Sequence, residues 1–110
     1  MKETTYNGWK NYETWNVALW ISNEQSSDSY WRDVTQECWD EAEAGNTLTR
    51  EEQAKYNLAD RLRDEITESQ PDLGATMWSD LLGAALCEVD WDEIAGNWLE
   101  DADKDQETCG

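Results

Sequence analysis

Carboxylates are the most abundant reactive groups of this 110-residue chain, which has 26 Asp and Glu, 8 Lys and Arg, and no His. Paired carboxylates can perform acid–base catalysis where one of them lies in a partly desolvated site that shifts its pKa. The sequence singles out none of the 26 acids, and no Ser or Cys lies in a nucleophile motif. We therefore expect that the protein is not an enzyme.

The possible metal ligands do not form a known site pattern. The run DADKDQE, residues 101–107, begins like a calcium-binding loop, but Gln106 occupies the position where that loop requires Gly. The three cysteines, Cys38, Cys87 and Cys109, are far apart in the sequence and no His accompanies them, so a structural zinc site is not expected. The sequence predicts no cofactor.

The net charge of −18 is the most unusual property of the chain. An acidic protein repels nucleic acid and anionic membranes and attracts a partner with a basic surface. The start of the chain has no apolar signal region, and no apolar run approaches the roughly 18 residues of a membrane span. An odd number of cysteines without a signal is typical of a reducing compartment. We expect a cytoplasmic protein that binds neither membrane nor nucleic acid directly.

The elements that must position the acids are predicted to be helices, in a single all-α domain, residues 1–110. A chain of this length supports one modest core. Residues 1–10 are expected to be irregular and residues 103–110 to be an acidic tail. The five predicted helices span about 12–23, 29–44, 50–68 and 71–87, and the fifth follows Asp90.

Local signals support the ends of these helices. Asn11 is a suitable N-cap, Asp90 opens the fifth helical stretch, and Thr49 with Glu52 forms a capping box. Ser27 or Asp28 is predicted to cap the second helix, and Pro71 suits a first helical turn.

The chain has eight Trp, four Tyr and no Phe; most of these aromatic residues are predicted to fill the core, and the alternative is that exposed ones are anchors for a protein partner. On the first helix Tyr12, Trp15 and Leu19 follow helical spacing, and the fourth helix is predicted to bury Trp78 and Leu81. Every Trp except Trp9 and Trp39 falls on an apolar face. Trp39 lies at the flank of the second helix, beside acids, and is therefore the predicted aromatic partner contact.

The acids form two predicted rows on the outer faces of helices. Carboxylates at positions i, i+3 and i+4 of a helix lie about 4.5–6 Å apart along its axis. This spacing is similar to that of phosphates along a nucleic-acid strand. One interpretation is mimicry of nucleic acid; the other is a solvated surface or an adaptation to high salt. The predicted partner-binding acids are Asp33, Glu37, Asp40 and Glu41 in the first row and Glu93, Glu100 and Asp101, followed by Asp103 and Asp105, in the second.

Two stretches, NYETWNVALW at residues 11–20 and SDLLGAALCEVDWDEIAGNWLED at residues 79–101, resemble a family of short acidic proteins without assigned function, encoded by phages, plasmids and bacterial genomes. The resemblance implies a host-takeover or anti-defence role, as in antirestriction and anti-CRISPR proteins. The expected function is inhibition of a basic nucleic-acid-handling host protein, such as a nuclease or CRISPR effector. The alternative is an interaction adaptor or scaffold that uses Trp39 and nearby apolar surface, with acids that only keep it soluble.

Overall fold

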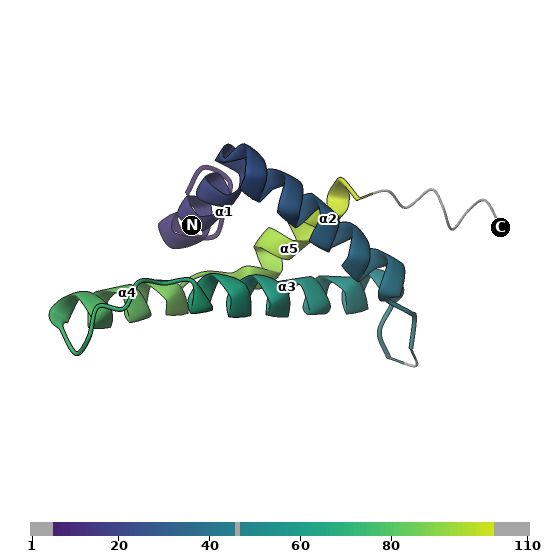
Figure 1. Ribbon diagram of the computed structural model, residues 1–110. Coiled ribbons are helices and arrows are strands. Elements are labelled where there is room, and N and C mark those ends of the chain that lie inside the picture. Colours follow the sequence, from purple (N-terminus) through teal and green to yellow (C-terminus); the bar gives the residue numbers. More distant parts are fainter. Residues whose placement is uncertain (1–5, 46, 103–110) are drawn as a thin grey trace.

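The computed structural model of the chain describes residues 6–45 and 47–102, and these residues form five α-helices without a β-sheet (Figure 1). The all-α prediction is confirmed. The predicted tail, residues 103–110, and the first half of the predicted irregular segment, residues 1–5, lie outside the described part. The helices are α1 Tyr12–Asn23, α2 Gln25–Glu41, α3 Arg50–Glu68, α4 Met77–Cys87 and α5 Trp91–Glu100.

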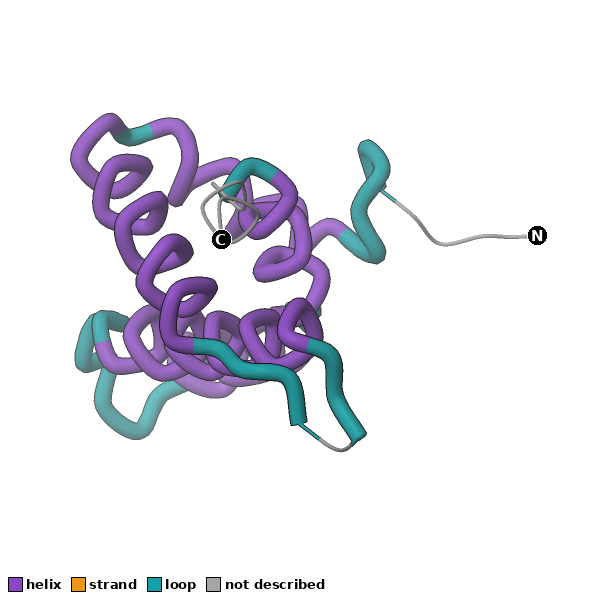
Figure 2. The backbone as a smooth tube through the Cα atoms, turned by 90° about the vertical axis from the view of Figure 1, so that its right-hand side faces the viewer, coloured by secondary structure: helices purple, strands orange, loops and turns teal. Residues whose placement is uncertain are grey.

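The longest helix, α3, forms one side of the helical packing. Both α2 and α5 pack against α3 and against each other, and α1 packs on α2 and α5. Figures 1 and 2 show α1, α2 and α5 on the same side of α3. The molecule measures 54 × 36 × 29 Å along its principal axes, and α4 lies at one end of it (Figure 1).

The core contains fewer tryptophans than the sequence predicts. Its most enclosed side chains include Leu58 and Leu62 of α3 and Ile94 of α5, each 0% exposed, and α2 adds the buried Trp31 and Trp39. Three further indoles pack partly against this core: Trp9, Trp91 and Trp98.

The inner face of α1 differs from the predicted one, because Tyr12 is exposed and Trp15 and Leu19 are only partly buried. This helix buries Thr14, Ala18 and Ile21 instead. Tyr12 is 51% exposed and Trp20 is 67% exposed. The ring of Tyr12 instead packs against that of Trp15, with centroids 5.5 Å apart, at the outside of the helix.

The fourth helix also differs from the prediction. It begins at Met77, where the Thr76 hydroxyl accepts a hydrogen bond from the Ser79 N–H at 3.3 Å, and Pro71 lies in the connection before it. A turn interrupts that connection: the Asp72 carboxylate accepts from the Gly74 N–H at 3.1 Å, and Gly74 has φ +67. The predicted burial of α4 is wrong, because the helix buries none of its residues.

The predicted caps succeed where the side chain reaches the first turn. Thr49 and Glu52 form the capping box of α3, and Asn11 and Asp90 cap α1 and α5. The second helix begins earlier than predicted, directly after Glu24, without a side-chain cap. It also ends earlier, at Glu41 instead of residue 44.

Candidate partner-binding surface

The acidic row of α2, which consists of Asp33, Glu37, Asp40 and Glu41, is exposed along its whole length. The opposite side of α2 is anchored in the core by buried side chains, among them Trp31, Val34 and Cys38. Because the helix cannot rotate without exposing these residues, the row is held toward solvent.

The carboxylates of the α2 acidic row make few internal contacts. Glu37 Oε1 lies 3.5 Å from Arg61 Nη1 of α3; the Glu37 side chain is largely exposed and that of Arg61 is partly exposed. Asp40 accepts a hydrogen bond from the Gln36 amide at 3.1 Å. Exposed pairs of this kind contribute about 0–1 kcal/mol, so a partner could displace them at low cost.

The prediction that Trp39 is an exposed partner contact is wrong. Its side chain is buried, at 5% exposure. The Arg50 guanidinium lies 4.3 Å from the centroid of the Trp39 ring, and its Nε and Nη2 donate to the Trp39 carbonyl oxygen at 3.1 and 2.8 Å. Contacts of α2 with both α3 and α5 widen its buried face beyond a single stripe, and this flank becomes core.

The structure brings together only part of the second predicted row: Glu93 and Glu100 line one open hollow beside α5, and Asp101 does not line it. Glu93 is half-buried, and its Oε1 accepts a hydrogen bond from the backbone N–H of Lys10 at 2.9 Å, so it holds the N-terminal turn against α5. Glu100 and Asp101 are exposed but border different hollows, Asp101 beside Arg32 and Glu100 beside Lys55. The predicted neighbours Asp103 and Asp105 lie outside the described residues.

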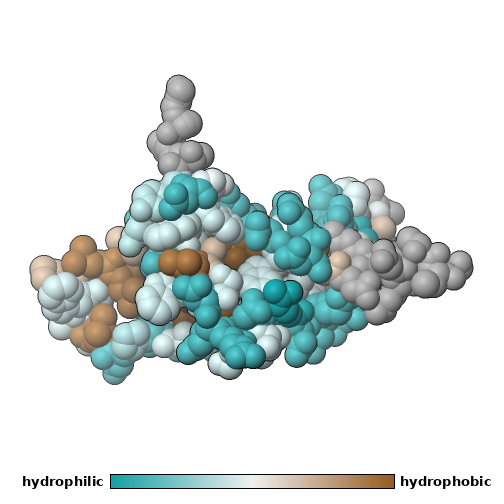
Figure 3. Space-filling model, turned by 90° about the horizontal axis from the view of Figure 1, so that it is seen from above, coloured by the Kyte–Doolittle hydropathy of each residue, from teal (hydrophilic) through white to brown (hydrophobic). Residues whose placement is uncertain are grey.

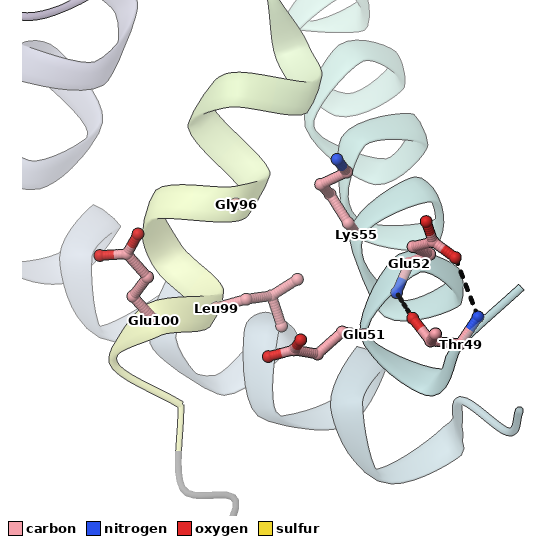
Figure 4. Close-up of a pocket in the computed structure, with 7 residues that line it drawn as sticks. All are labelled: Thr49, Glu51, Glu52, Lys55, Gly96, Leu99 and Glu100. Carbon is pink, nitrogen blue, oxygen red and sulfur yellow. Dashed lines mark hydrogen bonds between the residues drawn. The ribbon is translucent and has the colours of Figure 1, made fainter.

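An open groove separates the start of α3 from the second half of α5, with a volume of about 390 Å³. Glu52 is committed to the capping box with Thr49, whereas Glu51, Glu100 and Lys55 present charged side chains at the rim (Figure 4). The groove is lined by Thr49, Glu51, Glu52, Lys55, Gly96, Leu99 and Glu100.

Sequence reasoning missed this groove, although one signal was available. Gly96 lies on the outward side of α5, where an added Cβ would meet only the Lys55 Cδ, at 3.7 Å. Glycine has no side chain. Where no neighbouring atom lies close to a glycine in a helix, the missing side chain leaves a gap on the helix surface. The groove joins this gap to the acids around it.

The apolar surface of α4 was also missed, because the sequence pattern predicts its burial. Met77 is 61% exposed, Trp78 is 62% exposed and Leu81 is 55% exposed. Figure 3 shows hydrophobic side chains gathered at the end of the molecule where α4 lies. The large exposed apolar side chains of a folded chain mark interaction sites when they cluster.

The described cysteines differ in accessibility. Cys38 is buried and Cys87 is exposed. Burial raises the pKa of the Cys38 thiol, the nearby Glu41 and Glu37 act in the same direction, and Arg61 opposes them. A thiol that stays protonated is a poor nucleophile.

Two features are absent from residues 6–45 and 47–102. No three Cys, Asp or Glu side chains there are placed to hold a metal ion together. None of the five helices has the length and apolar character of a membrane span.

Comparison with known proteins gives one result. No curated protein and no solved structure matches the chain. The sequence model of a family of unknown function, DUF7249, matches residues 2–104. Because this match covers nearly the full length, the chain belongs to the DUF7249 family.

Proposed function

We propose that this protein is a non-enzymatic inhibitor, encoded by a phage or another mobile element, that binds a basic nucleic-acid-handling protein of its host. The resemblance of its two sequence stretches to proteins of mobile elements supports this context. A defence nuclease or CRISPR effector is the target class that fits best, because such proteins present Lys and Arg to phosphates. The observation that carries the proposal is the exposure of all four carboxylates of the α2 acidic row.

The charge density of this row is close to that of a nucleic-acid strand. Asp33 and Glu41 are eight residues apart, which corresponds to about 12 Å along a helix. Four charges over this length give about one charge per 3–4 Å, and one strand of B-DNA carries about one per 3.4 Å. A surface built to bind phosphates would therefore find a similar pattern of charge on α2.

Three of the described arginines are paired with acids of the same chain. Arg32 lies 2.8 Å from Asp28, Arg61 lies 3.1 Å from Glu65, and Arg63 lies 3.3 Å from Asp60. Since the chain has 26 acids and only 8 bases, a large negative excess remains to steer a basic partner toward it.

The test is capture of host proteins on the immobilised full-length chain, followed by elution with salt and with a short DNA duplex. The variant carries Asp33→Asn, Glu37→Gln, Asp40→Asn and Glu41→Gln. Because each neutralised carboxylate weakens a charge-based contact, we expect the variant to lose the retained basic proteins. The duplex should elute them from the wild-type chain, since both compete for one surface.

A matched control neutralises four exposed acids away from the row: Glu24→Gln, Glu68→Gln, Glu88→Gln and Asp92→Asn. It changes the net charge by the same four units and should keep the retained proteins. Equal loss from both variants would mean that total charge, rather than the row, causes retention. Retention that neither salt nor the duplex weakens would contradict the proposal.

The adaptor is the second candidate function, and the exposed Met77, Trp78 and Leu81 of α4 favour it. In that case the acids keep an interaction protein soluble and the apolar side chains supply the contacts. Neutralising the α2 acidic row would then leave binding intact, whereas a charge placed on α4 would abolish it.

A further inference from the structure

The outward side of α4 combines large apolar side chains with one carboxylate. Met77, Leu81 and Ala84 are exposed at i, i+4 and i+7, and the exposed Trp78 flanks them. Asp80 is also exposed, and it lies on the same side because it follows Met77 by three residues and precedes Ala84 by four. These five residues are named here the α4 contact face; hydrophobic side chains gather at that end of the molecule in Figure 3.

The carboxylate of Asp80 has no partner among the described residues. No ion pair or side-chain hydrogen bond there involves it, and no Lys or Arg occurs between Arg63 and Lys104. Asp80 lies in the first turn of α4, where the helix dipole favours an acid. The dipole does not account for the four apolar side chains that are exposed around this acid.

The chain itself does not supply an occupant for the α4 contact face. Residues 1–5 and 103–110, outside the described part, contain only Met1 and Cys109 as apolar residues. A second copy is a poor match, because a two-fold contact would place Asp80 of both subunits in one interface, and each chain carries a net charge of −18. Like charges brought together across an interface weaken it.

The chemistry of the face defines the kind of partner that fits it. The backbone hydrogen bonds of a helix are made within the helix, so α4 offers side chains and not an edge to which a strand could be added. A helical stripe of anchors suits the apolar face of an amphipathic helix. The complement of Asp80 is a Lys or Arg at the border of that apolar face.

We propose that the α4 contact face binds an amphipathic helix of another protein, with Lys or Arg beside its apolar stripe. Met77 and Leu81 pack on the apolar stripe, Trp78 supplies the largest contact area, and Asp80 pairs with the base. The inference goes beyond the proposed inhibition and does not use the α2 acidic row. Failure of either proposal would therefore leave the other standing.

The size of the face predicts a weak complex. Met77 and Ala84 are seven residues apart, which corresponds to about 10 Å along the helix, so the face contacts about two turns of a partner. An exposed ion pair adds about 0–1 kcal/mol. The apolar side chains should therefore supply most of the affinity, and Asp80 should supply the preference for a basic over an acidic helix. We expect a dissociation constant of about 10 μM to 1 mM.

The test is titration of the full chain, with reducing agent present, into a fluorescently labelled synthetic peptide of about four helical turns. The peptide carries Leu on one face and Lys on the other. Anisotropy measures binding at about 150 mM salt, where long-range attraction is screened. A second peptide has the same composition in an order that forms no apolar face, and a third has Glu in place of Lys. The variants are Trp78→Ser, Leu81→Ser and Asp80→Asn.

Matched controls separate the α4 contact face from the rest of the surface. Trp20→Ser removes a tryptophan of similar exposure, 67% against 62% for Trp78. Asp92→Asn neutralises another exposed acid in the first turn of a helix. The variant with all four acids of the α2 acidic row neutralised tests whether the Lys of the peptide binds there instead.

We expect the Leu–Lys peptide to bind the wild-type chain at least about fivefold more tightly than either other peptide. Trp78→Ser and Leu81→Ser should weaken its binding about fivefold or more, and Asp80→Asn about two- to threefold. The three control chains should bind it like wild type, and circular dichroism should show unchanged helix in every variant.

Equal binding of the Leu–Lys peptide and its reordered form would overturn the proposal. So would α4 variants that bind like wild type, or loss of binding when the α2 acidic row is neutralised. Should an α4 variant lose its helical circular dichroism, amide NMR spectra of the wild-type chain decide. The peptide must then shift amide signals of α4, and shifts confined to other helices would refute the assignment.

Discussion

The side-chain hydroxyl of Thr14 accepts a hydrogen bond from the backbone N–H of Asp90 at 2.9 Å, which joins α1 to the start of α5. Asn11 makes a second bond at this junction, because its amide Nδ2 donates to the Glu88 carbonyl oxygen at 2.7 Å. The two sequence stretches that carry the family resemblance, residues 11–20 and 79–101, therefore meet in space. The Asn and Thr of the first stretch hold the helices in place, so its role at this junction is structural.

Thr14→Val should destabilise the fold while nearly preserving the shape of the side chain. Thr14 is 0% exposed, and Val cannot accept the Asp90 N–H or donate to the Asn11 carbonyl oxygen Oδ1, which Thr14 does at 2.6 Å. A buried donor without a partner costs about 1–3 kcal/mol. Urea unfolding followed by circular dichroism measures the loss in the free energy of unfolding.

Thr14→Ser is the matched variant, since it keeps the hydroxyl and loses one methyl group. It should retain more stability than Thr14→Val. If Val were the more stable of the two, packing rather than the hydrogen bond would hold this junction.

Arg50→Ala should also lower stability, because Arg50 both covers the Trp39 ring and donates twice to the Trp39 carbonyl oxygen. We expect a loss of about 1–2 kcal/mol in the free energy of unfolding. Arg63→Ala is the comparison: Arg63 is 54% exposed in its pairs with Asp60 and Asp64, and its removal should cost less than about 1 kcal/mol. Equal losses would mean that the cover over Trp39 is energetically unimportant.

Helix ends could be predicted from the sequence where a side chain and the first turn interact locally. The N-terminal caps formed by Asn11, Asp90 and the Thr49–Glu52 pair depend on residues three apart, and these are visible in any sequence. The start of α4 could not be predicted in this way. The Asp72–Gly74 turn separates Pro71 from the helix, and several turn and helix geometries compete for such a segment.

Which face of a helix becomes buried depends on its neighbours, and the sequence does not state these. On α1 the largest apolar residues predicted one face, but the helix packs on α2 and α5 and buries Thr14, Ala18 and Ile21. On α2 the same pattern correctly placed the acidic row outward, because strongly charged residues define the solvent side by themselves. Trp39 lies between the two faces of α2. Contacts with α3 on one side and α5 on the other bury this flank of the helix, so the expectation that Trp39 is accessible to a partner is wrong.

The two glycines Gly96 and Gly74 should respond to alanine with opposite signs. At Gly96, in the middle of α5, the new Cβ would meet only the Lys55 Cδ, at the ordinary distance of 3.7 Å, so Gly96→Ala should stabilise by about 0.5–1 kcal/mol. At Gly74 the φ of +67 is unfavourable for a side chain, and Gly74→Ala should destabilise by about 1 kcal/mol. Thermal unfolding compares the two variants, and a destabilised Gly96→Ala would show that the groove beside α5 is more crowded than its geometry indicates.

The buried Cys38 should react slowly with thiol reagents, and its environment should make stability fall at high pH. Burial raises the pKa of its thiol, so the folded chain keeps this proton at pH values where an unfolded chain loses it. The resulting stabilisation is present below the ordinary pKa of cysteine and is lost as pH rises through the raised value.

The Cys87→Ser, Cys109→Ser double variant isolates Cys38, and its labelling rate should increase sharply when urea unfolds the chain. The exposed Cys87, studied with Cys38→Ser and Cys109→Ser, should label quickly in the folded chain. Equally fast labelling of both cysteines without denaturant would mean that α2 opens readily, and the α2 acidic row could then not be held on a rigid helix.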